Sequence, residues 1–241
     1  MKNMSRRQIV LCLAAVLASA CVPRRVPLDP EFLKNPSHKV GVALTEHPVL
    51  AAHRVGAQGL LDMAVNAAVD GNLESHLKTI DTSKLHGLVD EYVGRLTQRG
   101  LQARRLDTQR LQRFKTLGHD QPSASEMKAL AQEENVDSVL LITTLCGTIR
   151  PYYGFIPLKA PSAYCALTGR LIDLTSKRVE WVGVLHGEEA SVPVKGEWDQ
   201  APDFPNLTAA VHKAIAQAHD YLLADFFEGG AGTASPAHAR R

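Results

Sequence analysis

The sequence lacks every short motif that would identify a familiar catalytic centre. It has no Gly-x-Ser-x-Gly turn, no glycine-rich phosphate-binding loop and no dinucleotide-binding fingerprint. Its ten histidines include no His-Glu-x-x-His pattern, and none lies beside a pair of cysteines as a zinc site would require. We therefore expect a chain that is not an enzyme, with no catalytic residue, metal site or cofactor. An acid–base site assembled in space from distant residues stays open.

The chain also lacks an excess of charge of either sign. It contains 27 basic and 25 acidic side chains, and three of the basic ones lie in the first twenty residues, which hold no acidic one. Without those twenty residues the net charge is close to −1. Nucleic-acid binding normally requires a concentrated basic surface, so we expect no nucleic-acid partner.

The apolar run near the N-terminus is too short to span a membrane. Residues Ile9 to Ala20 would extend roughly 18 Å as a helix, against a hydrocarbon core of about 30 Å. The run follows basic residues and ends in small residues directly before Cys21, which is typical of an export signal. Small residues before a cysteine resemble the lipobox of bacterial lipoproteins, although the usual leucine lies at position −4. We expect cleavage before Cys21 and lipid on Cys21; an ordinary signal with an incidental cysteine is the alternative.

The resemblance to bacterial lipoproteins implies three acyl chains, which exceed the two signals needed for stable membrane attachment. Val22 follows the cysteine, and the absence of aspartate there favours the outer membrane, with the protein facing the periplasm. Residues 5–9 partly resemble a twin-arginine signal, but Ile9 replaces the preferred phenylalanine, so both export routes stay open.

The composition along the chain divides it into four parts. We predict a signal peptide over 1–20, a lipidated tether over 21–37, a folded domain over 38–227 and a disordered tail over 228–241. The tether carries prolines and no periodicity, and when fully extended it would reach on the order of 50 Å from the lipid.

The folded part has the pattern of an α/β domain. Apolar runs predict a strand over 39–45, a short strand over 101–106 and a central strand from 136, and residues 163–174 and 178–186 predict an antiparallel hairpin. Helical spacing predicts helices around 60–68, 85–96, 124–134 and 207–226, with Asn135 as a stop. We therefore expect a layered domain with a mixed, partly antiparallel sheet covered by helices.

Two passages resemble a known group of proteins. They are the helix-to-strand passage Ala131–Leu140 and the hairpin Gly169–Trp181, with an aspartate, a tight turn and then a strand that bears tryptophan. Both resemble the periplasmic domains of outer-membrane lipoproteins such as the curli-secretion lipoprotein and the activator of penicillin-binding proteins. The resemblance covers about half of the mature chain and implies a fold more than an activity.

Cys146 and Cys165 lie at equal distances from the centre of residues 151–161. If the strands on either side pair as a hairpin, the two cysteines face each other, and an exported protein can form the disulfide. Two buried free thiols are the alternative, and a redox or metal role is a third.

Residues 150–161 concentrate aromatic side chains and prolines where a plain turn would be polar. Tyr152, Tyr153, Phe155 and Ile156 are candidate partner-binding residues of a rigid recognition loop. The alternative is that these side chains fold back onto the domain.

Other charged and histidine groups favour ordinary surface roles. Six arginines between 95 and 113 could approach anionic lipid or cell-wall polymer, or could form a salt-bridged or solvated surface. His212 and His219 share a helix face that we interpret as solvated, and His47 and His53 bracket an expected turn.

Together these features favour a lipid-anchored, non-catalytic accessory or assembly factor at the outer membrane. Its partners would be the membrane, through the N-terminal lipid, and another envelope protein or a second copy of itself. A ring-forming secretion component and a periplasmic enzyme without a recognisable motif are the alternatives.

Overall fold

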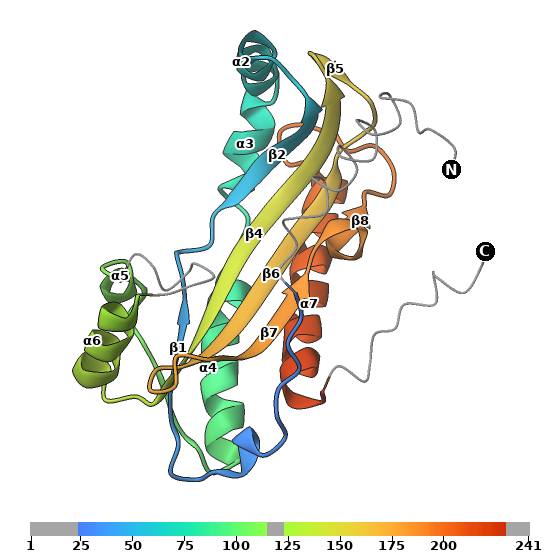
Figure 1. Ribbon diagram of the computed structural model, residues 1–241. Coiled ribbons are helices and arrows are strands. Elements are labelled where there is room, and N and C mark those ends of the chain that lie inside the picture. Colours follow the sequence, from blue (N-terminus) through green and yellow to red (C-terminus); the bar gives the residue numbers. More distant parts are fainter. Residues whose placement is uncertain (1–23, 115–122, 230–241) are drawn as a thin grey trace, which may run out of the picture.

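A strand of 16 residues, β4 (Ser138–Tyr153), is the centre of the sheet in the computed structural model, which describes residues 24–114 and 123–229 (Figure 1). Its first five residues, 138–142, pair in parallel with β1, and residues 138–149 pair antiparallel with β6. The main strand order is β3-β1-β4-β6-β7, so the predicted α/β fold with a mixed sheet is confirmed.

The bounds of the elements are as follows. The other strands are β1 (Lys39–Leu44), β2 (Leu50–Ala57), β3 (Gln102–Arg105), β5 (Ile156–Pro157), β6 (Ser162–Asp173), β7 (Val179–Leu185) and β8 (Ser191–Pro193). The α-helices are α2 (Leu60–Val69), α3 (Gly71–Leu77), α4 (Ser83–Gln98), α5 (Thr108–Leu111), α6 (Ala124–Glu134) and α7 (Pro205–Phe227), and the 3-10 turns are η1 (Phe32–Lys34) and η2 (Gly187–Ala190).

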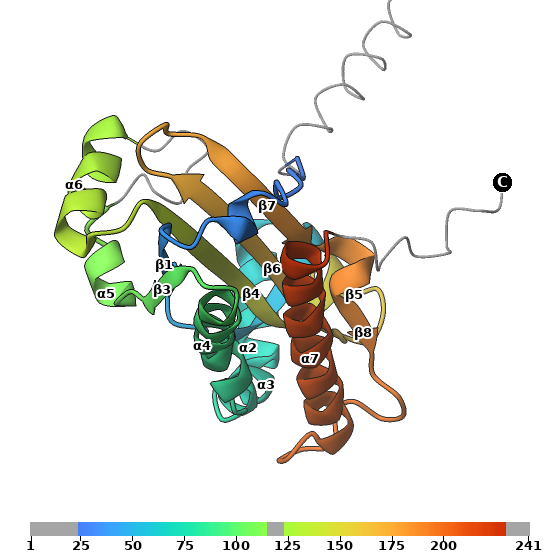
Figure 2. The ribbon, with the colours of Figure 1, turned by 90° about the horizontal axis from the view of Figure 1, so that it is seen from below.

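Two helices, α4 and α7, lie side by side on one face of the sheet and enclose the main core (Figure 2). Trp181 on β7 is fully buried there, packs edge-on against Phe226, and donates its indole N–H to Asp225 at 3.1 Å. The hydroxyl of buried Tyr92 donates to the carbonyl of Leu222 at 2.8 Å and so ties α4 to α7. These aromatic side chains pack in the core while their polar atoms are hydrogen-bonded, so they fix α7 against both α4 and the sheet.

On the opposite face of the sheet, α5 and α6 pack over one end and form a second, smaller core. Leu130 of α6 packs there with Leu141 of β4 and Ile172 of β6. Asn135 ends α6 in the left-handed conformation, as predicted, with φ of 45°.

Strand β2 was not predicted from the sequence. It pairs in parallel with the second half of β4, from Leu50 opposite Cys146 to Ala57 opposite Tyr153, so His53 lies within a strand and the expected turn between His47 and His53 is wrong. Gly147 allows the close approach of the two strands, because its φ is +135° and a Cβ atom there would lie 2.1 Å from the carbonyl oxygen of Ala51.

The N-terminal segment differs from the predicted tether. Val26 and Val182 exchange two backbone hydrogen bonds across the free edge of β7, at 3.2 and 2.9 Å, and Leu28 is buried in the main core. Arg25 donates to the carbonyl of Val184 at 3.1 Å. The described residues 24–37 therefore belong to the folded domain, because apolar burial and edge pairing outweigh the freedom suggested by the prolines.

Several predictions fall outside the described residues. These are the signal peptide 1–20, the lipid attachment at Cys21 and the tail from residue 230 onward. Within residues 24–114 and 123–229, no helix combines the length and the apolarity that crossing a bilayer requires.

Candidate functional site

Helix α2 presents its apolar side chains to solvent. Leu60 is 89% exposed and Leu61 is 77% exposed, and Met63, Val65 and Val69 are also exposed. The sequence correctly predicted a helix from the spacing of these residues, but an apolar stripe normally faces the core. Here the stripe faces outward, so α2 is inverted relative to an ordinary surface helix.

The inward side of α2 is polar. Asp62, Asn66 and Asp70 follow one another at intervals of four residues and therefore lie on one face of the helix. Asp62 accepts a hydrogen bond from the backbone N–H of Gly59 at 2.8 Å, which caps the helix. The amide nitrogen of buried Asn66 donates to the side chain of Gln58 at 2.8 Å and to the carbonyl of Gly154 at 3.1 Å. This spacing of polar residues was the sequence signal for the inverted orientation.

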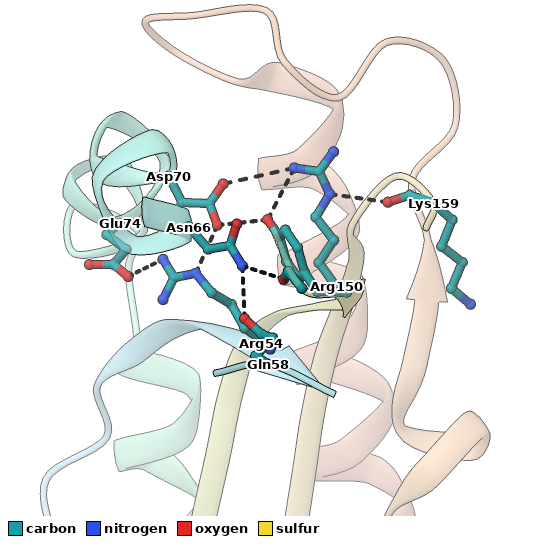
Figure 3. Close-up of polar contacts among 9 residues, drawn as sticks. Arg54, Gln58, Asn66, Asp70, Glu74, Arg150 and Lys159 are labelled. Carbon is teal, nitrogen blue, oxygen red and sulfur yellow. Dashed lines mark hydrogen bonds and ion pairs between the residues drawn. The ribbon is translucent and has the colours of Figure 1, made fainter. Parts of the chain in front are cut away.

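Asp70 is the centre of a buried polar cluster between the helices and the ends of β2 and β4 (Figure 3). Its carboxylate accepts a hydrogen bond from Arg54 at 2.9 Å and another from the hydroxyl of Tyr152 at 3.0 Å. Arg54 also donates to Glu74 on α3 at 2.6 Å. A buried carboxylate is costly unless it is paired and hydrogen-bonded, and here both conditions are met.

Arg150 completes the cluster from the β4 side. Its guanidinium lies 3.8 Å from Asp70, stacks over the ring of Trp198 at 4.9 Å from the ring centre, and donates to the carbonyl of Lys159 at 3.1 Å. Two arginines therefore face two carboxylates, Asp70 and Glu74. The cluster links α2, α3, β2 and the segment after β5 into one rigid unit.

Two residues of the cluster, Tyr152 and Arg54, have pKa values above their ordinary values. Burial is the main cause that raises the pKa of Tyr152, and the neighbouring Asp70 carboxylate raises it further, so the hydroxyl stays protonated as a donor. Burial lowers the pKa of Arg54, but the hydrogen bonds to Glu74 and Asp70 outweigh that effect and raise it above its ordinary value.

The hairpin of β4 and β5 lies beside the start of α2 and exposes most of the predicted recognition residues. Tyr153 is 68% exposed and Phe155 is 64% exposed, and Ile156 and Leu158 are also mostly exposed. Tyr152 is only 3% exposed and points into the polar cluster, so its assignment as a partner-binding residue is wrong. Successive side chains of a strand point to opposite faces, which separates the two tyrosines.

We call the exposed apolar side chains of α2 and of this hairpin the apical surface. It consists of Leu60, Leu61, Met63, Val65, Val69, Tyr153, Phe155, Ile156 and Leu158. Val49, Val55 and Leu145 continue it along β2 and β4 and are also exposed. A hollow of about 550 Å³ lies along this continuation, lined among others by Met63, Leu145 and Tyr164.

The two cysteines lie below the apical surface, directly opposite each other on β4 and β6. Their sulfurs are 2.06 Å apart in a disulfide bond, and both residues are buried in the main core. The bond joins the two longest strands of the sheet near the level where β2 begins to pair with β4.

The six arginines between 95 and 113 make local contacts rather than a free basic patch. Five of them form ion pairs: Arg95 with Glu91, Arg104 and Arg110 with Glu134, Arg105 with Asp90, and Arg113 with Glu133. Arg99 stacks over the ring of Phe227 at 4.6 Å from its centre. The salt-bridged interpretation of this group therefore fits the structure.

The histidines do not form a metal site within the residues that the structure describes, where no group of three potential ligands comes together. His219 differs from its prediction, because it is buried and its ring contacts Glu91 at 3.1 Å and Asp220 at 2.9 Å instead of facing solvent.

Comparisons with known proteins give similarity in fold at low sequence identity. No family model matches the chain, and no curated protein matches it. A homolog of the neuraminyllactose-binding hemagglutinin from Helicobacter pylori has 12% identity and a TM-score of 0.36, with 84% of this chain and 88% of that chain covered. Lipoprotein GNA1162 from Neisseria meningitidis has 15% identity and a TM-score of 0.29, with 74% and 98% covered. Protein XCC0632 from Xanthomonas campestris has 14% identity and a TM-score of 0.34, with 84% and 91% covered.

The solved structures similar to this chain thus include a bacterial lipoprotein. We take no function from any of them.

Proposed function

We propose that this chain is a lipid-anchored, non-catalytic envelope protein that acts as an accessory or assembly factor through protein–protein contact at its apical surface. The observation that carries the proposal is the inverted helix α2, whose polar residues face the domain and whose apolar residues face solvent. A large exposed apolar patch on a folded protein typically marks an interaction site.

The composition of the apical surface supports a protein partner. It combines tyrosine, phenylalanine, methionine and aliphatic side chains, and exposed Lys159 lies beside it next to Leu158. The centres of protein interfaces are likewise enriched in aromatic residues and methionine and depleted of charge.

The rigidity of the surface supports the same proposal. The polar cluster around Asp70 fixes α2 against the sheet, so little conformational entropy remains to be lost when a partner binds. The strongly polar groups of this region are bonded to one another and are largely buried, which supports a structural role for them instead of a catalytic one.

Site-specific photo-cross-linking in cells that produce the full chain tests the proposal. We expect a benzophenone amino acid in place of Phe155 to form a covalent adduct with a protein. The same group in place of Lys213, which is exposed on α7, is the matched control and should give no such adduct. Labelling of lipid alone from position 155, or no adduct at all, would contradict the proposal.

A further inference from the structure

A second hollow, of about 670 Å³, lies between the N-terminal segment and β7. Parts of the segment 26–38 form one wall, and residues 178–180 form the other. The first wall is held in place by the two backbone hydrogen bonds between Val26 and Val182. We call this space the β7 hollow; the residues that line it are different from those of the apical surface.

Glu180 is the unusual residue of the β7 hollow. Its oxygen Oε2 is buried and has no hydrogen-bond partner in the described ranges 24–114 and 123–229. A buried polar atom in a folded protein nearly always has a partner, and leaving one without a partner is costly, above all when the group carries a charge. Glu180 therefore keeps an unused capacity to accept a hydrogen bond.

The other acidic groups around Glu180 are already engaged. The carboxylate of Asp29 accepts a hydrogen bond from the backbone N–H of Glu31 at 2.9 Å. Glu31 in turn accepts one from the ammonium group of Lys34 at 2.6 Å. Asp173 accepts two backbone N–H groups of the turn that follows it. The β7 hollow is thus distinguished by one unpartnered carboxylate and not by a cluster of acids.

The electrostatic surroundings of Glu180 favour a further positive group. Burial is the main cause that raises the pKa of Glu180, and the carboxylate of Asp173 raises it further. The charges of His38 and Arg178 counteract this rise only in part. Although the structure describes both residues, neither donates a hydrogen bond to the buried oxygen, and the ring of His38 contacts the hydroxyl of Ser138 at 2.8 Å instead. A cation beside the carboxylate would offset the cost of its burial.

The remaining side chains of the hollow indicate the kind of cation. Val26, Phe32 and Val179 contribute apolar groups to its walls. Metal ions such as calcium prefer a shell of several oxygen ligands, and a planar guanidinium binds best to both oxygens of a carboxylate. An ammonium group is a compact charge that suits a single oxygen, and an alkyl chain attached to it can lie against apolar side chains.

We infer that the β7 hollow binds a primary alkylamine, whose ammonium group donates to Oε2 of Glu180 and whose alkyl chain lies against Val26, Phe32 and Val179. This inference goes beyond the proposed function and does not depend on it, because the apical surface takes no part in the site.

Methyl NMR on the full chain in phosphatidylcholine discs tests the inference, with n-butylamine as the probe. At neutral pH the amine should shift the methyl signals of Val26 and Val179, with a dissociation constant on the order of 1 mM. The signals of Leu88, which is buried on α4, should stay unchanged. n-Butanol has the same alkyl chain without the charge and should bind at least about tenfold more weakly.

Two matched substitutions locate the charge that is recognised. Glu180→Gln keeps the size of the side chain and should weaken the binding of butylamine at least about tenfold. Glu31→Gln removes an exposed charge from the same hollow, one already paired with Lys34, and should change the affinity less than about twofold. Unchanged signals of Leu88 show that each variant is folded. Equal affinity of the wild-type chain and Glu180→Gln, equal binding of butanol, or no shift with butylamine would overturn the inference.

The same signals separate two sources of the ammonium group. Phosphatidylethanolamine carries a primary ammonium group at the bilayer surface, whereas the methylated headgroup of phosphatidylcholine has no N–H donor. Shifts of Val26 and Val179 in discs that contain phosphatidylethanolamine, without added amine, assign the site to a lipid headgroup. Shifts with butylamine alone assign it to a free amine.

Discussion

At the scale of single residues, the neighbours Tyr152 and Tyr153 have opposite environments. The hydroxyl of Tyr152 donates to buried Asp70 and accepts a hydrogen bond from Arg150 at 3.4 Å, whereas Tyr153 faces solvent. One tyrosine therefore supports the apical surface from inside, and the other forms part of it.

This difference predicts unequal effects of the same substitution. Tyr152→Phe removes a hydrogen bond to a buried carboxylate and should lower the free energy of unfolding by about 1–3 kcal/mol. Tyr153→Phe is the matched control and should change it by less than about 0.5 kcal/mol. Urea denaturation of both variants is the measurement, and equal midpoints would show that the hydrogen bond from Tyr152 to Asp70 does not stabilise the fold.

The sequence grouped these two residues because the segment 150–161 was interpreted as a connection. Alternation of side chains applies only to strands, so it could separate Tyr152 from Tyr153 only once β4 was known to extend to residue 153. Phe155 and Ile156 are exposed, as a recognition loop requires, and their binding of a partner stays a prediction.

At the scale of elements, the spacing of apolar residues predicted where the helices lie, but not which face of each helix packs against the core. The bounds of α4 and α7 agree with the expected periodic stretches because their apolar stripes face the core. The stripe of α2 has the same spacing and faces outward. The pattern of β2 was missed because Leu-Ala-Ala-His-Arg-Val lacks strict alternation, and its pairing with β4 depends on contacts distant in sequence.

The pairing of β4 with β6 gives a prediction at the same scale. The disulfide closes a loop with a sequence separation of 19, so its loss should cost about 3 kcal/mol of unfolding free energy. Urea denaturation with and without reductant measures the loss, and a chain carrying both Cys146→Ala and Cys165→Ala should not respond to reductant. An intact mass that matches two free thiols before reduction would contradict the bond.

At the scale of the whole molecule, the sequence predicted the layered α/β fold and the hairpin of β6 and β7 correctly. These features depend on local patterns that each strand or helix carries within itself. The N-terminal segment could not be predicted in this way, because Val26 is held by Val182, more than a hundred residues away in the sequence.

The membrane attachment gives the prediction for the entire chain. Cys21→Ser should move the protein out of the membrane fraction or leave it as an unprocessed precursor, while its thermal unfolding stays unchanged because residue 21 precedes the described domain. Cell fractionation and circular dichroism are the measurements. Unchanged recovery of the variant in the membrane fraction, in a form cleaved to its mature length, would show that another part of the chain holds it there.

The contacts of Arg25 and Val26 with β7 place the start of the domain close to Cys21 in the sequence, the residue proposed to carry the lipid. With lipid on Cys21, only three residue steps separate the lipidated residue from Arg24, which is about 10 Å when extended. A free tether over 21–37 would instead reach on the order of 50 Å. The β7 edge then lies next to the bilayer, and helix α2 lies at the opposite edge of the sheet, beyond β2 (Figure 1). Under the proposed function, a partner that binds α2 would therefore contact the domain on the side that faces away from the bilayer.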